Sequence, residues 1–253
     1  MCGRFALTEK PEAVAETFGL AELEGFPPRY NIAPSQPILI VADGEAPLRG
    51  SNETGRKALL VRWGFVPGWV KDPREFPMLI NARAETAAEK PSFRAAMRHR
   101  RILVPASGFY EWYRSGGKGE KSEPFWLRPR SGGPVAFAGL METWASPDGS
   151  EFDSAAIVTT SANADLKPIH DRMPVVIQPE DFSRWLDCRT QEPRDVADLM
   201  RPAPERFFEA IPVSDKVNRV ANTGPDLLER VEREPPKKPE KPRSDGGGQL
   251  SFF

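Results

Sequence analysis

Prolines and glycines interrupt this sequence so often that it cannot build long regular elements. The 27 Pro and 20 Gly together make up 47 of the 253 residues, about 19% where ~12% is usual. This content excludes a bundle of long helices and favours short elements joined by many turns. Runs of β-branched and aromatic residues bounded by Pro or Gly predict strands. They lie at residues 37–42, 58–67, 78–84, 102–105, 108–113, 135–144, 154–162 and 174–177.

Helices are predicted to be few and short. One begins after Thr8, has Pro11 in its first turn and ends at Gly19. Others are expected over residues 92–98, 179–186 and 193–200. Because helices and strands do not alternate regularly, we expect a single α+β domain over residues 2–232. Its core would be a mostly antiparallel, partly closed β-sheet with short flanking helices.

The end of the chain differs from the rest in composition. Residues 233–248 are rich in Pro, Gly and charge and lack apolar side chains, which predicts a disordered linker. The five residues that follow, QLSFF, resemble the pentapeptide with which bacterial proteins bind the replicative sliding clamp, with Phe252 in place of Leu. We predict that Gln249, Leu250, Phe252 and Phe253 bind the clamp groove. The alternative is an apolar tail that docks on its own domain.

Cysteine, histidine and charge content limit the function classes. Two Cys and two His, without a C-x-x-C or H-x-x-x-H pair, provide neither a disulfide framework nor a standard zinc site, so we expect no metal and no cofactor. The sequence has neither a long apolar run nor a secretory signal, which predicts a cytoplasmic protein. A net charge of -1 argues against nucleic-acid binding unless the sum hides a local basic cluster.

Cys2 is informative through its position. Removal of Met1 would leave an α-amine and a thiol on adjacent carbons, and near neutral pH a usable fraction of each is nucleophilic. Cys2 could then be an amino-terminal nucleophile with its own amine as base, as in hydrolases and glutamine amidotransferases. Alternatively, the amine condenses with an aldehyde and the thiol closes a thiazolidine ring. A third interpretation makes Cys2 an ordinary small residue at the start of a strand.

Further side chains could transfer protons or bind a substrate. His170, before an apolar strand, is a better proton carrier than His99 in a basic run, although a lone histidine is often structural. Glu111 lies among four aromatic residues, and an inward orientation would raise its pKa, whereas an outward one would leave it solvated. Asn81 and Arg83 share one strand face, where both could meet a phosphate.

A cluster of arginines is concealed by the net charge. Arg94, Arg98 and Arg101 recur at the spacing of one helix face, which could hold a sugar-phosphate backbone. Trp63 and Trp69 would then stack on bases or wedge between them, although a single Trp more often belongs to the core.

Seven segments, in order, resemble the SRAP family of abasic-site processing proteins, also named SOS response-associated peptidases. They are MCGRF (1–5), RYNIAPSQ (29–36), VRWGFVPGW (61–69), NARAET (81–86), FRAAMRHRRILVPASGFYEW (93–112), VTTSAN (158–163) and IHDRMPVVI (169–177). The resemblance runs from Cys2 to about Val220. It implies a single α+β domain that binds single-stranded DNA and captures the ring-opened aldehyde of an abasic site through Cys2 as a thiazolidine.

The same resemblance implies roles for individual residues. Cys2 resembles the crosslinking nucleophile and Asn81 the residue that positions the sugar. Glu111 corresponds to the proton shuttle for imine formation, and His170 to the group that promotes ring opening and crosslink reversal. The residues expected to contact DNA are Arg4, Asn31, Pro34, Trp63, Arg83, Arg94, Arg98, Arg101, Thr160 and Arg172.

The predicted function is therefore the sensing of abasic sites in single-stranded DNA by covalent crosslinking, with associated lyase and self-reversal activity, so that the lesion is shielded during replication. We expect a monomer at the nucleoid or replication fork, with abasic single-stranded DNA and the sliding clamp as partners and no membrane contact. Two alternatives stay open. One is an amino-terminal cysteine peptidase or amidotransferase, and the other is a non-catalytic, clamp-tethered DNA-binding adaptor.

Overall fold

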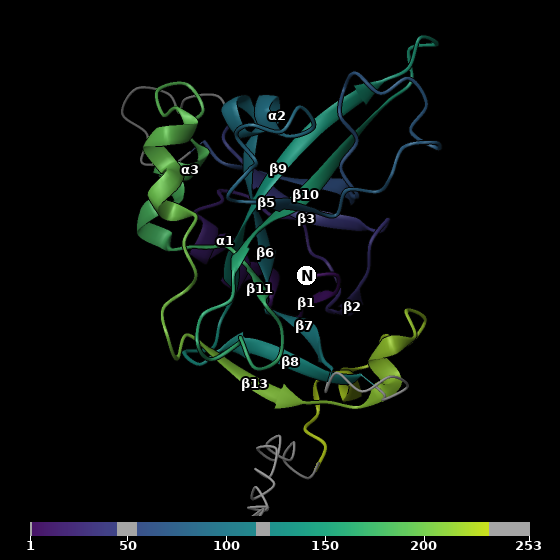
Figure 1. Cartoon of the computed structure of the whole chain (residues 1–253), viewed down its shortest axis with the longest axis vertical. Coiled ribbons are helices and arrows are strands. Elements are labelled where there is room, and N and C mark those ends of the chain that lie inside the picture. The colour runs from purple at the N-terminus through teal and green to yellow at the C-terminus, as the bar shows by residue number, and fades with distance from the viewer. Residues whose placement is uncertain (1, 45–54, 115–121, 233–253) are drawn as a thin grey trace, which may run out of the picture.

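Two β-sheets form the framework of the protein (Figure 1). The computed structural model describes residues 2–44, 55–114 and 122–232. The first sheet is antiparallel, has the strand order β13–β8–β7–β1–β2 and is open. Its strands are β1 (Phe5–Leu7), β2 (Arg29–Ile32), β7 (Gly108–Tyr113), β8 (Glu123–Pro129) and β13 (Phe208–Pro212).

The second sheet closes into a small barrel. Its order is β11–β10–β4–β3–β6–β9–β12, and β10 also pairs with β9, which closes the ring. Among the described strands of this sheet, β4 and β5 run parallel to their neighbour β10, and the other pairings are antiparallel. The strands are β3 (Pro37–Ala42), β4 (Lys57–Trp63), β5 (Asn81–Arg83), β6 (Arg101–Ala106), β9 (Val135–Ala145), β10 (Glu151–Ser161), β11 (Arg172–Pro174) and β12 (Val176–Ile177). The predicted α+β class with a mostly antiparallel, partly closed sheet is confirmed.

The described helices are short and flank the sheets. They are α1 (Pro11–Phe18), α2 (Arg94–His99), α3 (Phe182–Leu186), and the 3-10 segments η1 (Pro179–Asp181), η2 (Pro193–Leu199), η3 (Asp215–Asn218) and η4 (Pro225–Leu228). The predicted start and stop of α1 are confirmed, since Pro11 opens it and Gly19, at φ 64°, ends it. Within the described ranges, no helix has the length and apolar character needed to cross a membrane.

Aromatic side chains join the two sheets in a common core. Phe5 of β1 packs edge-on against Trp63 of β4, with ring centroids 5.2 Å apart. Phe137 of β9 lies 6.4 Å from Phe5 and 5.9 Å from Phe109 of β7. All four rings are buried. The central strands of the first sheet are thereby fixed to the barrel, and edge-to-face pairs of this kind add to the stabilisation from burial alone.

The chain passes from β6 of the barrel to the first sheet at Gly108, the first residue of β7. Its φ is +157°, and a Cβ atom there would lie 2.3 Å from the carbonyl oxygen of Leu127 and 2.8 Å from the ring of Trp126. Both neighbours belong to β8, which is paired to β7. Glycine is therefore required where the chain enters the strand that carries Glu111.

We predict that Gly108→Ala destabilises the protein by at least about 2 kcal/mol, because the methyl group would collide with backbone atoms. The measurement is the urea midpoint of unfolding. Gly25→Ala is the control, because nothing lies within 4 Å of the added atom, and it should change stability by no more than about 0.5 kcal/mol. Equal losses in the two variants would contradict the role of Gly108.

Candidate active site

Cys2 lies where the chain leads into the middle of the first sheet. β1 is placed between β2 and β7 (Figure 1). Phe5 is paired with Phe109, and the amide of Tyr110 donates to the carbonyl of Arg4 at 2.9 Å. Extending this antiparallel register places the residue after Cys2 opposite Glu111. Cys2 itself is fully buried and precedes β1, so burial alone does not distinguish a reactive residue from an ordinary small one at the start of a strand.

Burial dominates the chemistry of the Cys2 thiol. Desolvation strongly raises its pKa, and the charge of Glu111 raises it further. A hydrogen bond from the backbone of Arg4 acts in the opposite direction but is weaker. The thiol is therefore protonated at neutral pH, and its reaction has to be coupled to proton transfer.

Glu111 of β7 points inward, as the alternation predicted for one of the two orientations. It is 3% exposed, and Phe109, two residues before it on the same face, is fully buried. Burial raises the pKa of the Glu111 carboxyl, and the nearby His170 opposes this effect. A carboxyl with a raised pKa can both take and return a proton near neutral pH.

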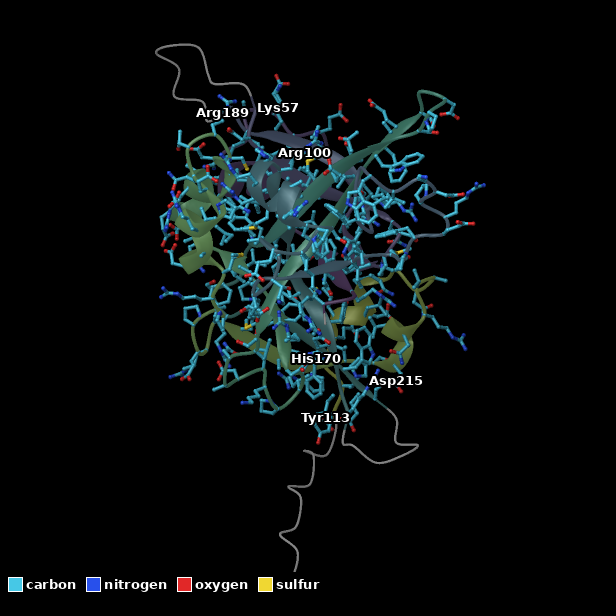
Figure 2. The ribbon with its side chains drawn as sticks, turned by 45° about the horizontal axis from the view of Figure 1, so that its top comes forward. Lys57, Arg100, Tyr113, His170, Arg189 and Asp215 are labelled. Atoms are coloured by element: carbon cyan, nitrogen blue, oxygen red, sulfur yellow. The ribbon has the colours of Figure 1, made fainter. Side chains whose placement is uncertain are left out.

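His170 faces Glu111 from another part of the chain. Its Nε2 lies 4.0 Å from Oε2 of Glu111, and its Nδ1 lies 2.9 Å from the backbone amide of Arg172. Because that amide is a fixed donor, the neutral ring accepts at Nδ1 and carries its proton on Nε2, toward Glu111. Nδ1 also lies 3.0 Å from a carboxylate oxygen of Asp171, whose side chain is 86% exposed and solvated. In Figure 2, His170 and Tyr113 lie toward the same end of the molecule.

Asn81 is the first residue of β5, and its side chain is hydrogen-bonded to the backbone of the preceding residue. Its Nδ2 donates to the carbonyl of Ile80 at 3.0 Å, and Nε1 of Trp63 donates to the same oxygen at 3.0 Å. Trp63 in turn packs on Phe5 of β1. Asn81 is therefore linked to the strand that begins just after Cys2.

Buried polar atoms without a partner gather at the predicted site residues. Among the described residues these atoms include Oδ1 of Asn81, Nε of Arg4 and Nε of Arg172, together with Oγ1 of Thr86. Buried polar atoms are normally hydrogen-bonded, and each exception needs an explanation. Oδ1 of Asn81 can accept one further hydrogen bond, and the two guanidinium Nε–H groups can each donate one.

Arg4 and Asn31 hold a loop of their own protein. Nη1 of Arg4 donates to Oδ1 of Asn31 at 2.6 Å and to the carbonyl of Val217 at 2.8 Å. Nδ2 of Asn31 donates to the carbonyls of Val217, Arg219 and Asn222. Asn31 is 4% exposed, so the prediction that it contacts DNA is wrong; its amide is fully engaged in folding this segment.

The predicted stacking of Trp63 on a base is contradicted by the structure, because Trp63 is fully buried with its indole N–H on a backbone carbonyl. Thr160 of β10 is 5% exposed, similar to Glu111, and its contact with DNA stays a prediction. Arg83 is exposed and Pro34 is half-buried, and their contacts with DNA also stay predictions. Trp69 is 61% exposed, as a base-stacking residue would have to be.

The predicted arginine face does not exist as a surface. α2 ends before Arg101, which lies in β6 and is 2% exposed. Its guanidinium donates to four backbone carbonyls, those of Met97, Trp185, Asp187 and Gln191. Arg98 is bound to Glu192 and to the carbonyl of Cys188. Arg98 and Arg101 therefore join α2 to the segment after α3 and do not form a phosphate-binding face. Arg94 is exposed, and its contact with DNA stays a prediction.

Glu85 and Thr159 are contacts of the site that the sequence did not reveal. Glu85 binds Arg172 through both carboxylate oxygens, at 2.6 and 2.9 Å, and the carbonyl of Thr159 accepts from Arg172 at 2.6 Å. Arg172, predicted to contact DNA, is thus tied to its own protein, with its side chain 14% exposed. A charge-pair search between separate motifs could have suggested Glu85, but nothing local to the sequence does.

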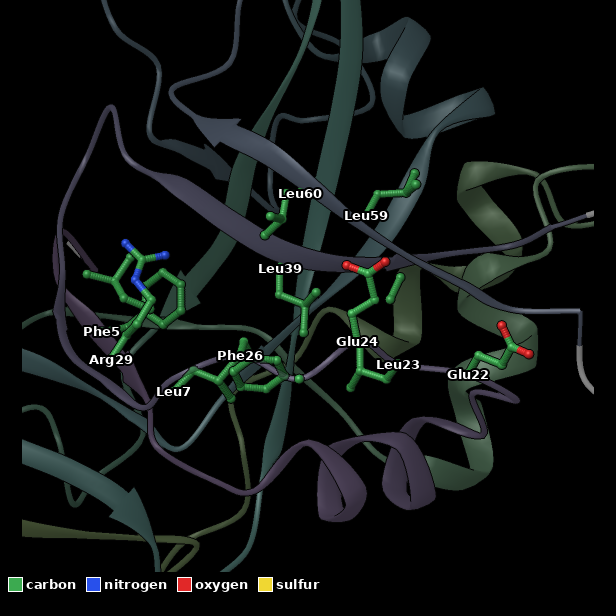
Figure 3. A pocket seen from close by; sticks show the side chains of 13 residues that line it. Phe5, Leu7, Glu22, Leu23, Glu24, Phe26, Arg29, Leu39, Leu59 and Leu60 are labelled. Atoms are coloured by element: carbon green, nitrogen blue, oxygen red, sulfur yellow. The ribbon is translucent and has the colours of Figure 1, made fainter.

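An apolar cavity of about 350 Å³ is lined in part by β1 (Figure 3). Its lining includes Phe5, Leu7, Phe26, Leu39 and Leu60. None of the four predicted catalytic residues lines it. Within the described part of the chain, no group of three or more His, Cys, Asp or Glu side chains could hold a metal ion.

Comparison with known proteins identifies the family of the chain. A family model described as SOS response associated peptidase (SRAP) matches residues 1–220. Abasic site processing protein YoqW of Bacillus subtilis is 39% identical, covering 90% of this chain and 99% of its own, and YedK of Escherichia coli is 32% identical, covering 91% and 100%. A crystal structure from Bacteroides thetaiotaomicron shares the fold, with a TM-score of 0.76, 23% identity and coverage of 91% and 100%. The chain therefore belongs to the SOS response associated peptidase (SRAP) family.

Proposed function

We propose that this protein processes abasic sites in single-stranded DNA by forming a covalent crosslink through Cys2. The relatives named abasic site processing proteins support this assignment, and they include HMCES of Gallus gallus at 30% identity. The observation that carries the proposal is the convergence of Cys2, Glu111 and His170, which lie far apart in the sequence. A buried thiol, a carboxyl of raised pKa and an imidazole supply a nucleophile and two proton carriers.

The reaction balances without a cofactor. Once Met1 is removed, the α-amine of Cys2 adds to the aldehyde carbon of the ring-opened sugar, and loss of water gives an imine. The thiol sulfur then adds to the imine carbon while its proton passes to the nitrogen, and a thiazolidine results. Ring closure is intramolecular and therefore strongly favoured.

The other residues move protons or hold the sugar. Glu111 delivers the proton that leaves with water and takes the thiol proton, since its raised pKa allows both. His170 would promote opening of the sugar ring and reversal of the crosslink. Asn81 would bind a sugar hydroxyl through its buried Oδ1. Proton loss from the carbon next to the imine, followed by departure of the 3′ phosphate, would give the associated lyase activity.

The raised pKa of Cys2 favours this route over a peptidase or amidotransferase. Nucleophilic cysteines of hydrolases have lowered pKa values, whereas the thiol here is held protonated by burial. In the aldehyde route the amine attacks first, and the thiol reacts only within the imine. A non-catalytic adaptor would not need the buried carboxyl beside Cys2.

We further propose that QLSFF, residues 249–253, binds the sliding clamp and brings the protein to replication forks, where the crosslink shields the lesion. These residues lie outside the described part of the structure. The chemistry of the segment, with Leu250 and two Phe side chains at the end of a charged stretch, supports this role.

Incubation with single-stranded DNA that contains an abasic site should give a heat-stable shifted band on a denaturing gel. We expect Cys2→Ala to abolish the band, because without the thiol the imine cannot close to a thiazolidine and hydrolyses on heating, and Cys188→Ala, the other thiol, to retain it. Absence of a band with the wild-type protein would leave the peptidase or the adaptor. Intact mass should show Met1 removed, and its retention would block the route.

The variant Glu111→Gln should lose crosslinking activity while gaining stability. We expect crosslinking to slow by about 100-fold or more, while the free energy of unfolding at pH 7 rises by about 0.5 to 2 kcal/mol. The pKa of Glu111 is higher in the folded than in the unfolded protein, so ionisation of this carboxyl lowers stability. The stability that the protonated carboxyl contributes is complete below its unfolded pKa of about 4.3 and is lost as the pH rises through its folded pKa. The advantage of the variant should therefore vanish below about pH 4.

Urea unfolding at pH 3.5 and pH 7 measures this difference. Glu205→Gln is the control, because Glu205 is exposed and its replacement should not alter stability at either pH. A Glu111→Gln protein that is less stable than the wild type at pH 7 would mean that partners of the carboxylate outweigh its burial.

Deletion of residues 249–253 should abolish clamp binding in calorimetry and leave crosslinking of naked single-stranded DNA unchanged. Ser251→Ala is the matched control, because it keeps the apolar side chains. Unchanged clamp affinity after the deletion would refute the tether.

A further inference from the structure

An ion pair spans β10 at the edge of the active site. β10 lies between β5 and β11, with Thr159 paired with Arg83 on one side and with Pro174 on the other. The side chain of Arg172 crosses β10 and reaches Glu85, which follows β5 in the chain. The ion pair therefore ties the strand that carries Asn81 to the strand that follows His170.

The geometry of this ion pair is fully specified. Glu85 accepts two parallel hydrogen bonds from the guanidinium, at 2.6 and 2.9 Å, the arrangement that fixes orientation best. The carbonyl of Thr159 accepts a third bond from Arg172 and also one from the amide of Ala84, next to Glu85. The pKa of Glu85 is lowered, chiefly by the hydrogen bond from Arg172, so the carboxylate is charged at neutral pH.

The backbone of Arg172 is the part that touches His170. Its amide donates to Nδ1 at 2.9 Å, which directs the proton-bearing Nε2 toward Glu111, 4.0 Å away. A shift of the Arg172 backbone would change the orientation of the imidazole. The backbone of Arg172 is held by its pairing with Ser161 of β10, and the bond of its guanidinium to Glu85 adds a second restraint on the residue that contacts His170.

We propose that Glu85 is a positioning residue that orients the imidazole of His170 through Arg172. Glu85 itself is half exposed and makes no contact with Cys2, Glu111 or Asn81 among the described contacts. The inference rests on the proposed function only for its effect on rate. The orientation of the ring is a property of the free protein and can be measured without DNA.

The first test is the nitrogen NMR spectrum of the imidazoles, which is simple because the chain has only two His. In the wild type we expect His170 to show a single tautomer with an acceptor Nδ1, while exposed His99 serves as the internal reference. Glu85→Gln should move the His170 shifts toward those of His99. Glu89→Gln, an exposed residue of the same turn, should leave them unchanged.

The second test separates rate from affinity. With saturating abasic DNA, Glu85→Gln should slow crosslinking by about tenfold. Binding of the DNA should not weaken, because the variant removes a negative charge near the phosphates. Added to His170→Gln, Glu85→Gln should cause little further loss, because both act through one group. A merely structural role would instead lower the affinity and add to the effect of His170→Gln.

The outcomes distinguish this inference from the proposed function. If the wild type forms no crosslink, the proposed function fails, and the NMR comparison still decides the role of Glu85. If the wild type crosslinks but Glu85→Gln leaves the His170 shifts and the rate unchanged, the positioning role is wrong.

Discussion

The pairing of β1 between β2 and β7 is the interaction on which the rest of the structure depends. β1 has only three residues, all buried, yet it is an inner strand of the first sheet. Through Phe5 it also reaches Trp63 of the barrel. The same strand carries Cys2 toward Glu111, so the packing that joins the two sheets and the proposed reactive groups both depend on the pairing of β1. A sequence change that weakened this pairing would affect fold and chemistry together.

Local signals in the sequence predicted the elements with strong boundaries. Pro11 and Gly19 mark the ends of α1, and the apolar runs gave most strands of the barrel. The predicted strand at 58–67 ends early, at Trp63, because Gly64 adopts a φ of +139°. β1 and β2 were not predicted as strands, since each is short and is stabilised only by pairing with a distant neighbour. Strand order and barrel closure likewise depend on long-range contacts that no local pattern encodes.

The site was predicted where the chemistry of a residue is local and missed where it depends on distant partners. Strand alternation along β7 allowed Glu111 to point inward or outward. Its 3% exposure in the structure shows that it points inward. The arginine cluster failed for the opposite reason. Helical spacing cannot reveal that Arg101 meets carbonyl groups more than 80 residues later, at Trp185 and Asp187. A charge counted in the sequence is thus no measure of a charge on the surface.

The inner position of β1 also sets an order of events during synthesis. Phe5 has to wait for Phe109 to leave the ribosome before the two can pair, which at usual elongation rates takes on the order of 5 to 20 s. Until then the start of the chain is accessible, and afterwards Cys2 is fully enclosed. The removal of Met1 that the proposed crosslink requires therefore meets least obstruction on the nascent chain. Removal of Met1 and pairing of β1 therefore compete in time. The long sequence separation between β1 and β7 extends the interval in which the amino terminus is accessible.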